Sequence, residues 1–304
     1  MKILFLGTPL FAKLVLERLH LSRHEIVAVI TQPDRPCGRG HKIKASEVKE
    51  YAIENNIPVY TFESVNRSME EIKKFDYDYA LTASFGQILS QEFLSYRPCL
   101  NVHPSLLPKY RGATPIQSAL LNGDEVTGVT IMKMVREVDA GDILLQAQYK
   151  LQEEDTTDIL MEKLGALGGE MAVDAFDMIE SGKAKFTPQD GSKAIFVKLI
   201  TKEDGLLDFS NNAEKLVNRV RALGGKPGCY FTLGEDTIKV SALKDVSSEF
   251  AGKPNEIIAA KKRFVIGCQN GAVEVLSCQA PSGKMLLARD FLNGYKVEGK
   301  EIKC

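Results

Sequence analysis

The sequence of 304 residues contains no tryptophan and only four histidines, and its six cysteines stand far apart. None of the cysteines forms a CxxC pair, and no histidine lies beyond residue 103. A structural zinc site needs four clustered nitrogen or sulfur ligands, so the sequence predicts none, and we expect no metal. Scattered thiols in a chain of this size are typical of buried apolar side chains in a reducing compartment, not of a disulfide scaffold.

Long apolar runs are also missing. No run approaches the roughly 20 residues that cross a bilayer. The apolar stretch after Lys2 ends at Gly7, which is too short for a signal peptide. We therefore expect a soluble, cytoplasmic protein without a membrane partner. The formal net charge of −1, taken over the whole chain, gives no sign of a nucleic-acid partner either.

The order of apolar and polar residues predicts two domains. In residues 1–182, short apolar runs alternate with helical patterns, which indicates a Rossmann-like α/β fold with a mainly parallel sheet. A long amphipathic helix at 157–180 closes this domain, and residues 183–204 are expected to form a linker. One helix and five short strands within residues 205–304 predict a smaller, OB-like β-barrel domain. The strands expected in the first domain cover residues 2–7, 26–31, 59–62, 79–84, 99–103 and 128–134.

The junction between the first strand and the first helix is the place to look for a dinucleotide site. Gly7, Thr8 and Pro9 stand where a dinucleotide-binding fold has GxGxxG, but only one glycine is present and Pro9 lacks an N–H to bind phosphate. A tight strand-to-helix turn, with Thr8 as the helix cap, explains the segment better than a dehydrogenase site does.

Asn101 and His103 are the first candidate catalytic residues. Alternate residues of a strand point to the same face, so these two side chains are expected side by side near the strand end that Pro104 sets. Open α/β sheets bind ligands outside the carboxyl ends of their strands. An amide donor beside an imidazole can stabilise a developing oxyanion. A structural histidine at a strand end explains the pattern alone equally well.

Asp139 lies in a glycine-containing turn between two apolar runs, where aspartates usually only cap the turn. If the fold brings it beside His103, its negative charge favours the imidazolium form.

A proline- and glycine-broken loop at residues 32–44 follows the second strand. Such loops are usually only solvated, but beside a candidate active site basic side chains indicate an anionic substrate. The basic side chains of this loop are Arg35, Arg39, His41, Lys42 and Lys44.

Four segments resemble known proteins. Residues 101–108 (NVHPSLLP) and Asp139 within VDAGD resemble the motifs of the folate-dependent formyltransferases. Residues 31–42 (TQPDRPCGRGHK) and 109–124 (KYRGATPIQSALLNGD) are similar to the methionyl-tRNA formyltransferases among them. The resemblance covers essentially the whole chain. It implies transfer of a formyl group from 10-formyltetrahydrofolate to the α-amino group of methionine on the initiator tRNA, for use in translation initiation.

The resemblance also implies roles for single residues. Asn101 and protonated His103 would hold the formyl oxygen as it becomes an oxyanion, and Asp139 would orient His103 and assist proton transfer. The basic loop would enter the acceptor stem, with Arg39 reading its end, and we expect the protein to act as a monomer. The residues expected to contact the folate are Ser105, Leu106, Leu107, Pro108, Phe85, Gly86, Gln87, Ile88 and Leu89.

Three other functions compete with this interpretation. An amino-sugar or glycinamide-ribonucleotide formyltransferase shares the catalytic motifs, but it leaves the basic loop and the second domain without a role. A tRNA-binding protein without activity is disfavoured by the complete set of three candidate catalytic residues. A Rossmann dehydrogenase is disfavoured by the incomplete glycine motif.

The near-zero net charge of the whole chain conceals a difference in charge between its two parts. Residues 1–190 hold 21 Lys and Arg against 27 Asp and Glu, a net charge of −6, and residues 191–304 hold 18 against 13, a net charge of +5. A basic second domain indicates a polyanionic partner. Lys261, Lys262 and Arg263 form the basic run that we expect to contact tRNA phosphates there.

Overall fold

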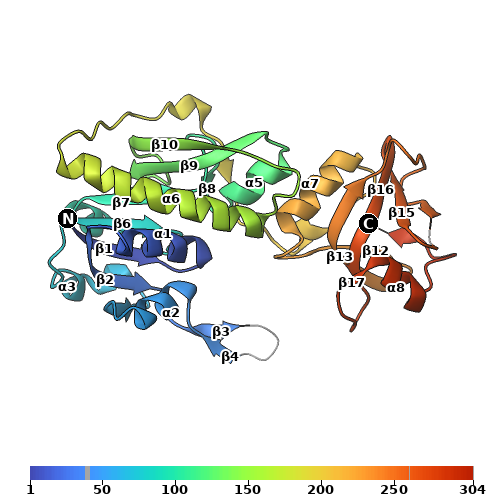
Figure 1. Cartoon of the computed structure of the whole chain (residues 1–304), viewed down its shortest axis with the longest axis horizontal. Helices are drawn as coiled ribbons and strands as arrows, with labels where there is room; N and C mark the ends of the chain where they lie inside the picture. Colours follow the sequence, from blue (N-terminus) through green and yellow to red (C-terminus); the bar gives the residue numbers. More distant parts are fainter. Residues whose placement is uncertain (38–41, 260, 304) are drawn as a thin grey trace. The chain divides into compact units, whose positions relative to one another are not determined.

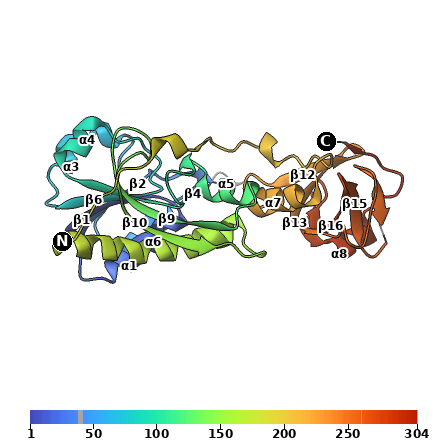
Figure 2. The same ribbon diagram turned by 90° about the horizontal axis from the view of Figure 1, so that it is seen from above.

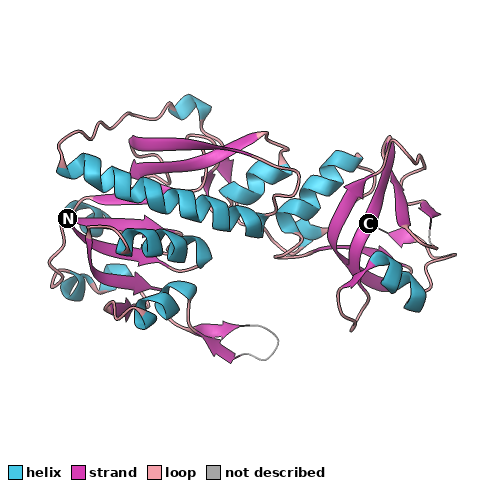
Figure 3. Cartoon of the chain, viewed as in Figure 1, coloured by secondary structure: helices cyan, strands magenta, loops and turns pink. Residues whose placement is uncertain are grey.

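The computed structural model describes residues 1–37, 42–259 and 261–303. Figures 1 and 3 show helices alternating with strands in the amino-terminal part of the chain and mostly strands in the carboxyl-terminal part. The domain boundaries expected at residues 182 and 205 stay a prediction, because each compact unit of the structure draws on several segments. The first unit comprises residues 1–115, 126–150 and 159–197, and the second comprises residues 116–125, 151–158 and 198–304.

The first unit is built on a seven-stranded sheet in the order β10-β9-β7-β6-β1-β2-β5. The strands β1, β2, β5, β6 and β7 run parallel, and β9 and β10 add an antiparallel edge. The central strands are continuous apolar runs because both faces of the sheet are covered. The α/β fold predicted from the sequence is thereby confirmed. The strands are β1 (Lys2–Gly7), β2 (Glu25–Thr31), β5 (Val59–Thr61), β6 (Tyr79–Ala83), β7 (Cys99–His103), β9 (Val126–Lys133) and β10 (Ile143–Lys150).

Helices cover both faces of this sheet (Figure 2). One face carries α1 (Leu10–His20), α2 (Glu47–Glu54) and the long α6 (Thr157–Glu180). The other carries α3 (Met69–Ile72) and α4 (Gln91–Tyr96), with the 3-10 turn η1 (Val65–Arg67) before α3. A further helix, α5 (Pro115–Leu121), follows the short strand β8 (Arg111–Gly112). Within the ranges described, no helix combines the length and apolar character needed to cross a membrane.

Two glycines let α6 pack closely against β7, the strand that carries the candidate site, and against α1. A Cβ at Gly168 would lie 2.7 Å from Cγ1 of Val102 in β7, and one at Gly169 would lie 2.7 Å from Cβ of Arg18 in α1. Both distances are shorter than van der Waals contact, so this packing is possible only because the two glycines have no side chain. A glycine inside a helix costs about 1 kcal/mol relative to alanine, and the close contact with β7 and α1 offsets that cost.

The first part of the expected linker packs against the first unit. Thr187 forms two main-chain hydrogen bonds with Ile143, 2.8 and 2.9 Å long. After the short turn η2 (Gly191–Lys193), strand β11 (Phe196–Val197) pairs in parallel with β8. Residues 184–197 are therefore attached to the first unit at two points.

The second unit holds a curled antiparallel sheet, a half-barrel, in the order β14-β15-β16-β13-β12-β18, with β17 paired to β16. Aromatic rings fill its core, where Phe231 contacts both Phe209 and Phe264. The smaller β-barrel domain predicted from the sequence is confirmed as a half-barrel. The sequence does not predict strands β17 and β18, because two residues each are too few to show an alternating pattern. The elements are η3 (Glu203–Gly205), α7 (Ala213–Leu223), β12 (Cys229–Leu233), β13 (Asp236–Asp245), β14 (Ile257–Ala259), β15 (Phe264–Cys268), β16 (Gly271–Gln279), β17 (Leu286–Leu287), α8 (Ala288–Gly294) and β18 (Ile302–Lys303).

Candidate active site

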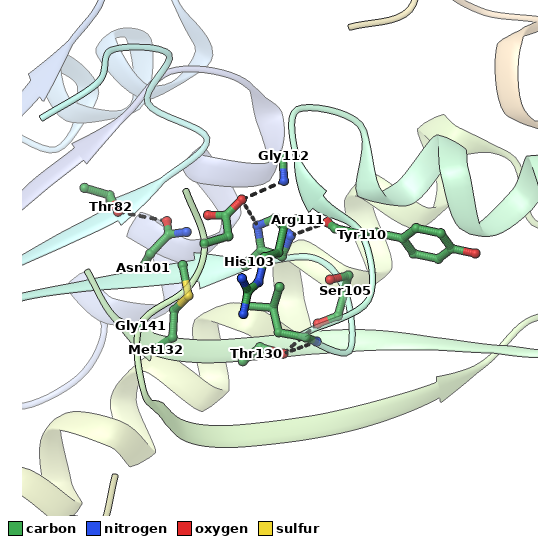
Figure 4. A network of polar contacts seen from close by, with 12 residues as sticks. Thr82, Asn101, His103, Ser105, Tyr110, Arg111, Gly112, Thr130, Met132 and Gly141 are labelled. Atoms are coloured by element: carbon green, nitrogen blue, oxygen red, sulfur yellow. Dashed lines mark hydrogen bonds and ion pairs between the residues drawn. The ribbon is translucent and has the colours of Figure 1, made fainter. Parts of the chain in front are cut away.

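The end of β7 places Asn101 and His103 on one face of the sheet, as their spacing predicts. Strand β7 lies between parallel β6 and antiparallel β9, and the register sets Asn101 opposite Thr82 and His103 opposite Thr130. The His103 side chain is only 5% exposed, whereas Asn101 is half-buried. Figure 4 shows both side chains within one network of polar contacts. The two residues therefore share one environment.

The amide of Asn101 is oriented by Thr82. The Thr82 hydroxyl donates a hydrogen bond of 2.8 Å to Oδ1 of Asn101 (Figure 4). Because this bond uses Oδ1 as an acceptor, the two N–H donors of Nδ2 are turned away from Thr82. An amide held in this way can donate to an oxygen that gains negative charge.

The ring of His103 is fixed through both nitrogens. Nε2 lies 2.9 Å from the main-chain carbonyl oxygen of Tyr110, which can only accept, so Nε2 carries a proton (Figure 4). Nδ1 lies 3.6 Å from Oδ2 of Asp139, an ion-pair distance that is too long for a hydrogen bond. Nδ1, the other ring nitrogen, therefore faces a carboxylate.

Asp139 reaches His103 from the loop of residues 134–142 between β9 and β10. Its Oδ2 accepts a hydrogen bond of 2.8 Å from the main-chain N–H of Gly112. The backbone is left-handed at Asp139 (φ 49°), at Tyr110 (φ 63°) and at Gly112 (φ 116°). Non-glycine residues in this conformation cost about 1–3 kcal/mol each and cluster at functional sites. The structure thus brings Asp139, whose sequence pattern alone indicates a turn cap, into the same cluster as His103.

The turn after β7 contains four of the residues expected to contact folate. The Ser105 hydroxyl donates to the carbonyl oxygen of Lys109 at 2.6 Å, and the Ser105 carbonyl accepts a 2.6 Å hydrogen bond from the Thr130 hydroxyl. The Ser105 hydroxyl therefore donates its hydrogen bond within the turn, and the two bonds fix the conformation of the turn that follows His103. Two of the four side chains are buried and two are half-buried: Ser105 and Leu107, then Leu106 and Pro108.

The loop after β6, also expected to contact folate, is divided between core and surface. Phe85 and Leu89 are buried in an apolar cluster. The Gln87 side chain is bonded to the main chain of the segment after β5, since it accepts from one N–H at 2.9 Å and donates to one carbonyl at 3.0 Å. Gly86 and Ile88 are exposed, Ile88 to 83%. Any folate contact from this loop therefore falls to Gly86, Ile88 and the main chain.

The same loop is tied to the turn after β1. Thr8 does not cap α1 as expected, because Pro9 occupies the cap position and the Thr8 hydroxyl donates to the carbonyl of Phe85 at 2.9 Å. A Cβ at Gly7 would lie 2.6 Å from Cβ of Ala12, which leaves no room for a side chain in the turn. The first strand-to-helix junction is thus a tight turn that supports the neighbouring loop.

The basic segment after β2 forms a hairpin where the sequence predicts a loop. Strands β3 (Arg35–Cys37) and β4 (Lys42–Lys44) pair antiparallel, and a two-stranded ribbon tolerates the proline that argues against a strand. Arg35 and Lys44 are opposite each other and exposed, and Lys44 pairs with Glu47 at 3.3 Å. Arg39 and His41 lie outside the described residues. The expected tRNA contacts of this segment stay a prediction.

Several residues of the polar network were not among the sequence candidates, and Thr82 and Tyr110 are two that contact Asn101 and His103 directly. Thr82 is a polar residue within an apolar strand, but its place opposite Asn101 depends on the pairing of β6 with β7, which the sequence does not predict. Tyr110 acts through its main-chain carbonyl, which any residue supplies, so the sequence holds no signal for it.

Three potential metal ligands meet elsewhere in the first unit. Ligand atoms of His24, Asp177 and Glu180 lie within 4.8 Å of one another. The two carboxylates already pair with Arg23 at 2.7 and 2.5 Å, and the Met1 ammonium lies 3.4 Å from Glu180. Burial, followed by the charge of that ammonium, lowers the pKa of His24. The cluster is therefore a charge network in which protein cations already neutralise the carboxylates.

Comparison with known proteins identifies the family of this chain. The model of the family Formyl transferase matches residues 1–176, and the model of its C-terminal domain matches residues 199–296. A relative from Sulfurihydrogenibium sp., named methionyl-tRNA formyltransferase, is 38% identical, and the alignment covers 99% of each chain.

Solved structures share the fold at lower identity. HypX from Aquifex aeolicus, in complex with tetrahydrofolic acid, aligns with a TM-score of 0.67 at 19% identity, over 98% of this chain and 48% of its own. An N-formyltransferase from Helicobacter canadensis, in complex with folinic acid and dTDP-3-aminofucose, aligns with a TM-score of 0.67 at 18% identity, over 90% of this chain and 98% of its own. Given the two matched models and the relative aligned over its full length, the chain belongs to the formyl transferase family and is a formyltransferase.

Proposed function

We propose that the chain transfers the formyl group of 10-formyltetrahydrofolate to the α-amino group of methionine on initiator methionyl-tRNA. The observation that carries the proposal is the convergence, at the end of β7, of an oriented amide, a buried imidazole and a carboxylate. These groups belong to Asn101, His103 and Asp139. Family membership limits the chemistry to formyl transfer.

In this mechanism the site stabilises charge and moves one proton. The folate supplies the formyl carbon; the acceptor amine loses a proton when the new C–N bond forms, and the folate nitrogen gains one when the old bond breaks. Nδ2 of Asn101 donates to the formyl oxygen as it becomes an oxyanion, and protonated Nδ1 of His103 stabilises the same charge. Asp139 balances the charge of the ring and accepts the proton that the amine loses, and this proton then passes to the folate nitrogen as the old C–N bond breaks.

The surfaces around these residues fit a folate donor. Leu106 and Pro108 present half-buried apolar surface directly after His103 in the chain, and Gly86 and Ile88 expose the loop after β6. A bicyclic ring needs such apolar walls together with a few main-chain hydrogen-bonding groups. We assign the donor site to these two segments.

Charge supports a tRNA as the acceptor. Residues 191–304 carry a net charge of +5, which is more than an amino-sugar nucleotide requires. In the first unit, Arg35 and Lys44 of the β3–β4 hairpin are exposed. The alignment with the relative named methionyl-tRNA formyltransferase covers 99% of this chain, and therefore spans both parts of it that match the family models. We assign the basic hairpin and the second domain to tRNA binding.

The proposal includes a monomer that works in the cytoplasm. One copy of the chain supplies the amide, the imidazole and the carboxylate, so a second copy is not needed to complete the site. Static light scattering under turnover conditions tests the oligomeric state. Activity only in a dimer would contradict this part of the proposal.

The decisive experiment is a formylation assay with 10-formyltetrahydrofolate and methionyl-initiator tRNA. Wild-type protein should form formylmethionyl-tRNA, and Asn101→Ala should lower kcat by about 10²–10³-fold, the usual effect of removing one oxyanion donor. Asn101→Asp is the matched control, because it keeps the shape and removes the N–H donors, and it should be at least as defective. Turnover of an amino-sugar nucleotide with none of the tRNA would overturn the proposal.

A further inference from the structure

Gln189, in the segment that the sequence predicts to be a linker, makes four hydrogen bonds to nitrogen and oxygen atoms with one amide, and its Nε2 also lies 3.8 Å from Sδ of Met132. Its Nε2 donates to the carbonyl oxygen of Asp139 at 2.9 Å and to that of Gly141 at 2.7 Å. Its Oε1 accepts from Nε of Arg111 at 3.1 Å and from Nη2 at 2.7 Å. These bonds use both donors and both acceptor positions of the amide. Gln189 therefore links the loop of residues 134–142 to strand β8.

Both segments that Gln189 joins hold the Asp139 carboxylate. On one side it binds the main chain of Asp139 itself, which has a left-handed φ of 49°. On the other side it binds Arg111, and the next residue, Gly112, donates its N–H to Oδ2 of Asp139 at 2.8 Å. The bond between Gly112 and Asp139 thus closes a ring of contacts that passes through Gln189. Without the glutamine amide, the main chain of the loop would lose both hydrogen bonds from Nε2, and its link to β8 would depend on the carboxylate's own bond to Gly112.

The main chain around Gln189 is itself fixed on both sides. Before it, Thr187 exchanges two hydrogen bonds with Ile143 at the start of β10. After it, the N–H of Ile195 donates to the carbonyl of Pro108 at 3.2 Å, and the carbonyl of Ile195 accepts from the N–H of Arg111 at 2.8 Å. The position of the amide is therefore determined by the fold and not by the loop that it holds.

We propose that Gln189 is a positioning residue for formyl transfer: it holds the loop of residues 134–142 so that the Asp139 carboxylate stays beside Nδ1 of His103. This inference rests on the proposed function, in which Asp139 balances the charge of His103. Gln189 does not touch the reacting atoms. Displacement of a catalytic group by about 1 Å can cost about 10²-fold in rate, so Gln189→Ala should lower kcat by about 10- to 100-fold.

A double-mutant cycle distinguishes positioning from a general structural role. Gln189→Ala should lower kcat and leave KM for both substrates within about twofold. In an Asp139→Asn background, Gln189→Ala should change kcat by less than about twofold, because the charge to be positioned is gone. A merely structural role predicts that the two decreases in kcat multiply, and that result would overturn the inference. Thermal unfolding of each variant confirms that the comparison is made on folded protein.

Gln189→Glu is the matched second variant. It keeps an oxygen for Arg111 but sets an oxygen, in place of N–H donors, against the carbonyls of Asp139 and Gly141. It should be as defective as Gln189→Ala although its link to Arg111 is intact, and full activity would overturn the inference. If Asp139→Asn is itself fully active, the proposed role of Asp139 fails and this inference with it. If Asp139→Asn is defective but Gln189→Ala is fully active, only the inference fails.

Discussion

Replacing Thr82 with valine tests whether the orientation of one amide controls the rate. Valine has nearly the shape of threonine but no hydroxyl, so the variant removes the 2.8 Å hydrogen bond to Oδ1 of Asn101. Thr82 is only 3% exposed, so water has little access to replace the missing donor. The amide of Asn101 is then free to turn and to present Oδ1, an acceptor, where the reaction needs a donor.

The size of the effect follows from the cost of an unsatisfied acceptor. Leaving a buried polar group without its partner costs about 1–3 kcal/mol. If the variant makes the catalytic orientation of the Asn101 amide less favourable by this amount, kcat decreases by about 5- to 150-fold, since about 1.4 kcal/mol corresponds to a factor of ten. The complete removal of the donor in Asn101→Ala, about 10²–10³-fold, sets the upper limit. KM for both substrates should change by less than about twofold, because the amide acts on the transition state.

Initial rates of methionyl-tRNA formylation, measured over a range of each substrate, give kcat and KM for the variants. Thr82→Ser is the matched control, since it keeps the hydroxyl and should retain kcat within about threefold. Adding Thr82→Val to Asn101→Ala should have no further effect, because the amide is already absent. A Thr82→Val enzyme with wild-type kcat would refute the reasoning, and so would decreases in kcat that multiply in the double variant.

Two further predictions concern packing and charge. Gly168→Ala should lower the free energy of unfolding by about 1–3 kcal/mol because its Cβ would overlap a valine of β7, whereas Gly191→Ala, with open space around it, should change it by less than about 0.5 kcal/mol. Urea denaturation measures both, and equal stabilities would contradict the packing argument. Replacing Lys261 and Lys262 with glutamine should flatten the dependence of log Kd for tRNA on log salt by about 0.9 for each phosphate that the protein no longer neutralises. Arg263→Gln should flatten this dependence less, because two carboxylates already pair with the guanidinium at 2.6 and 2.7 Å. A larger change in slope for Arg263→Gln than for a lysine variant would contradict this prediction.

The pair in β7 could be predicted from sequence because its signal is local. Asn101 and His103 differ by two positions, Pro104 follows them, and a strand is the one regular element that sets such residues side by side. The alternation of apolar runs with helical patterns likewise depends on neighbours in the chain, and it yields the parallel sheet. The shared face of Asn101 and His103 and the parallel sheet can therefore be inferred without knowing which strands pair.

The loop after β6, which the resemblance assigns to folate binding, cannot be divided into core and site residues from its sequence alone. A resemblance assigns residues 85–89 to folate binding as a block, but the fold uses their side chains in different ways. Phe85 and Leu89 fill the core, and the amide of Gln87 satisfies main-chain groups of a distant segment. Which side chains of a loop face inward depends on tertiary packing, because a loop has no period of its own. Only Gly86 and Ile88 keep exposed side-chain positions.

The strand order explains why Asp139 could not be assigned to the site from its own pattern. Strand β9 is antiparallel to β7, with Lys133 opposite Leu100, so β9 ends at the amino end of β7. The rule that ligands bind at the carboxyl ends of parallel strands therefore gives no reason to bring the following loop to His103. The loop nevertheless returns, adopts a left-handed backbone at Asp139 and sets the carboxylate 3.6 Å from the ring. A conformation that local preferences disfavour must be stabilised by tertiary hydrogen bonds, and here the N–H of Gly112 and the amide of Gln189 supply them. The geometry of Asp139 thus depends in part on Gln189, which lies outside every motif recognised in the sequence.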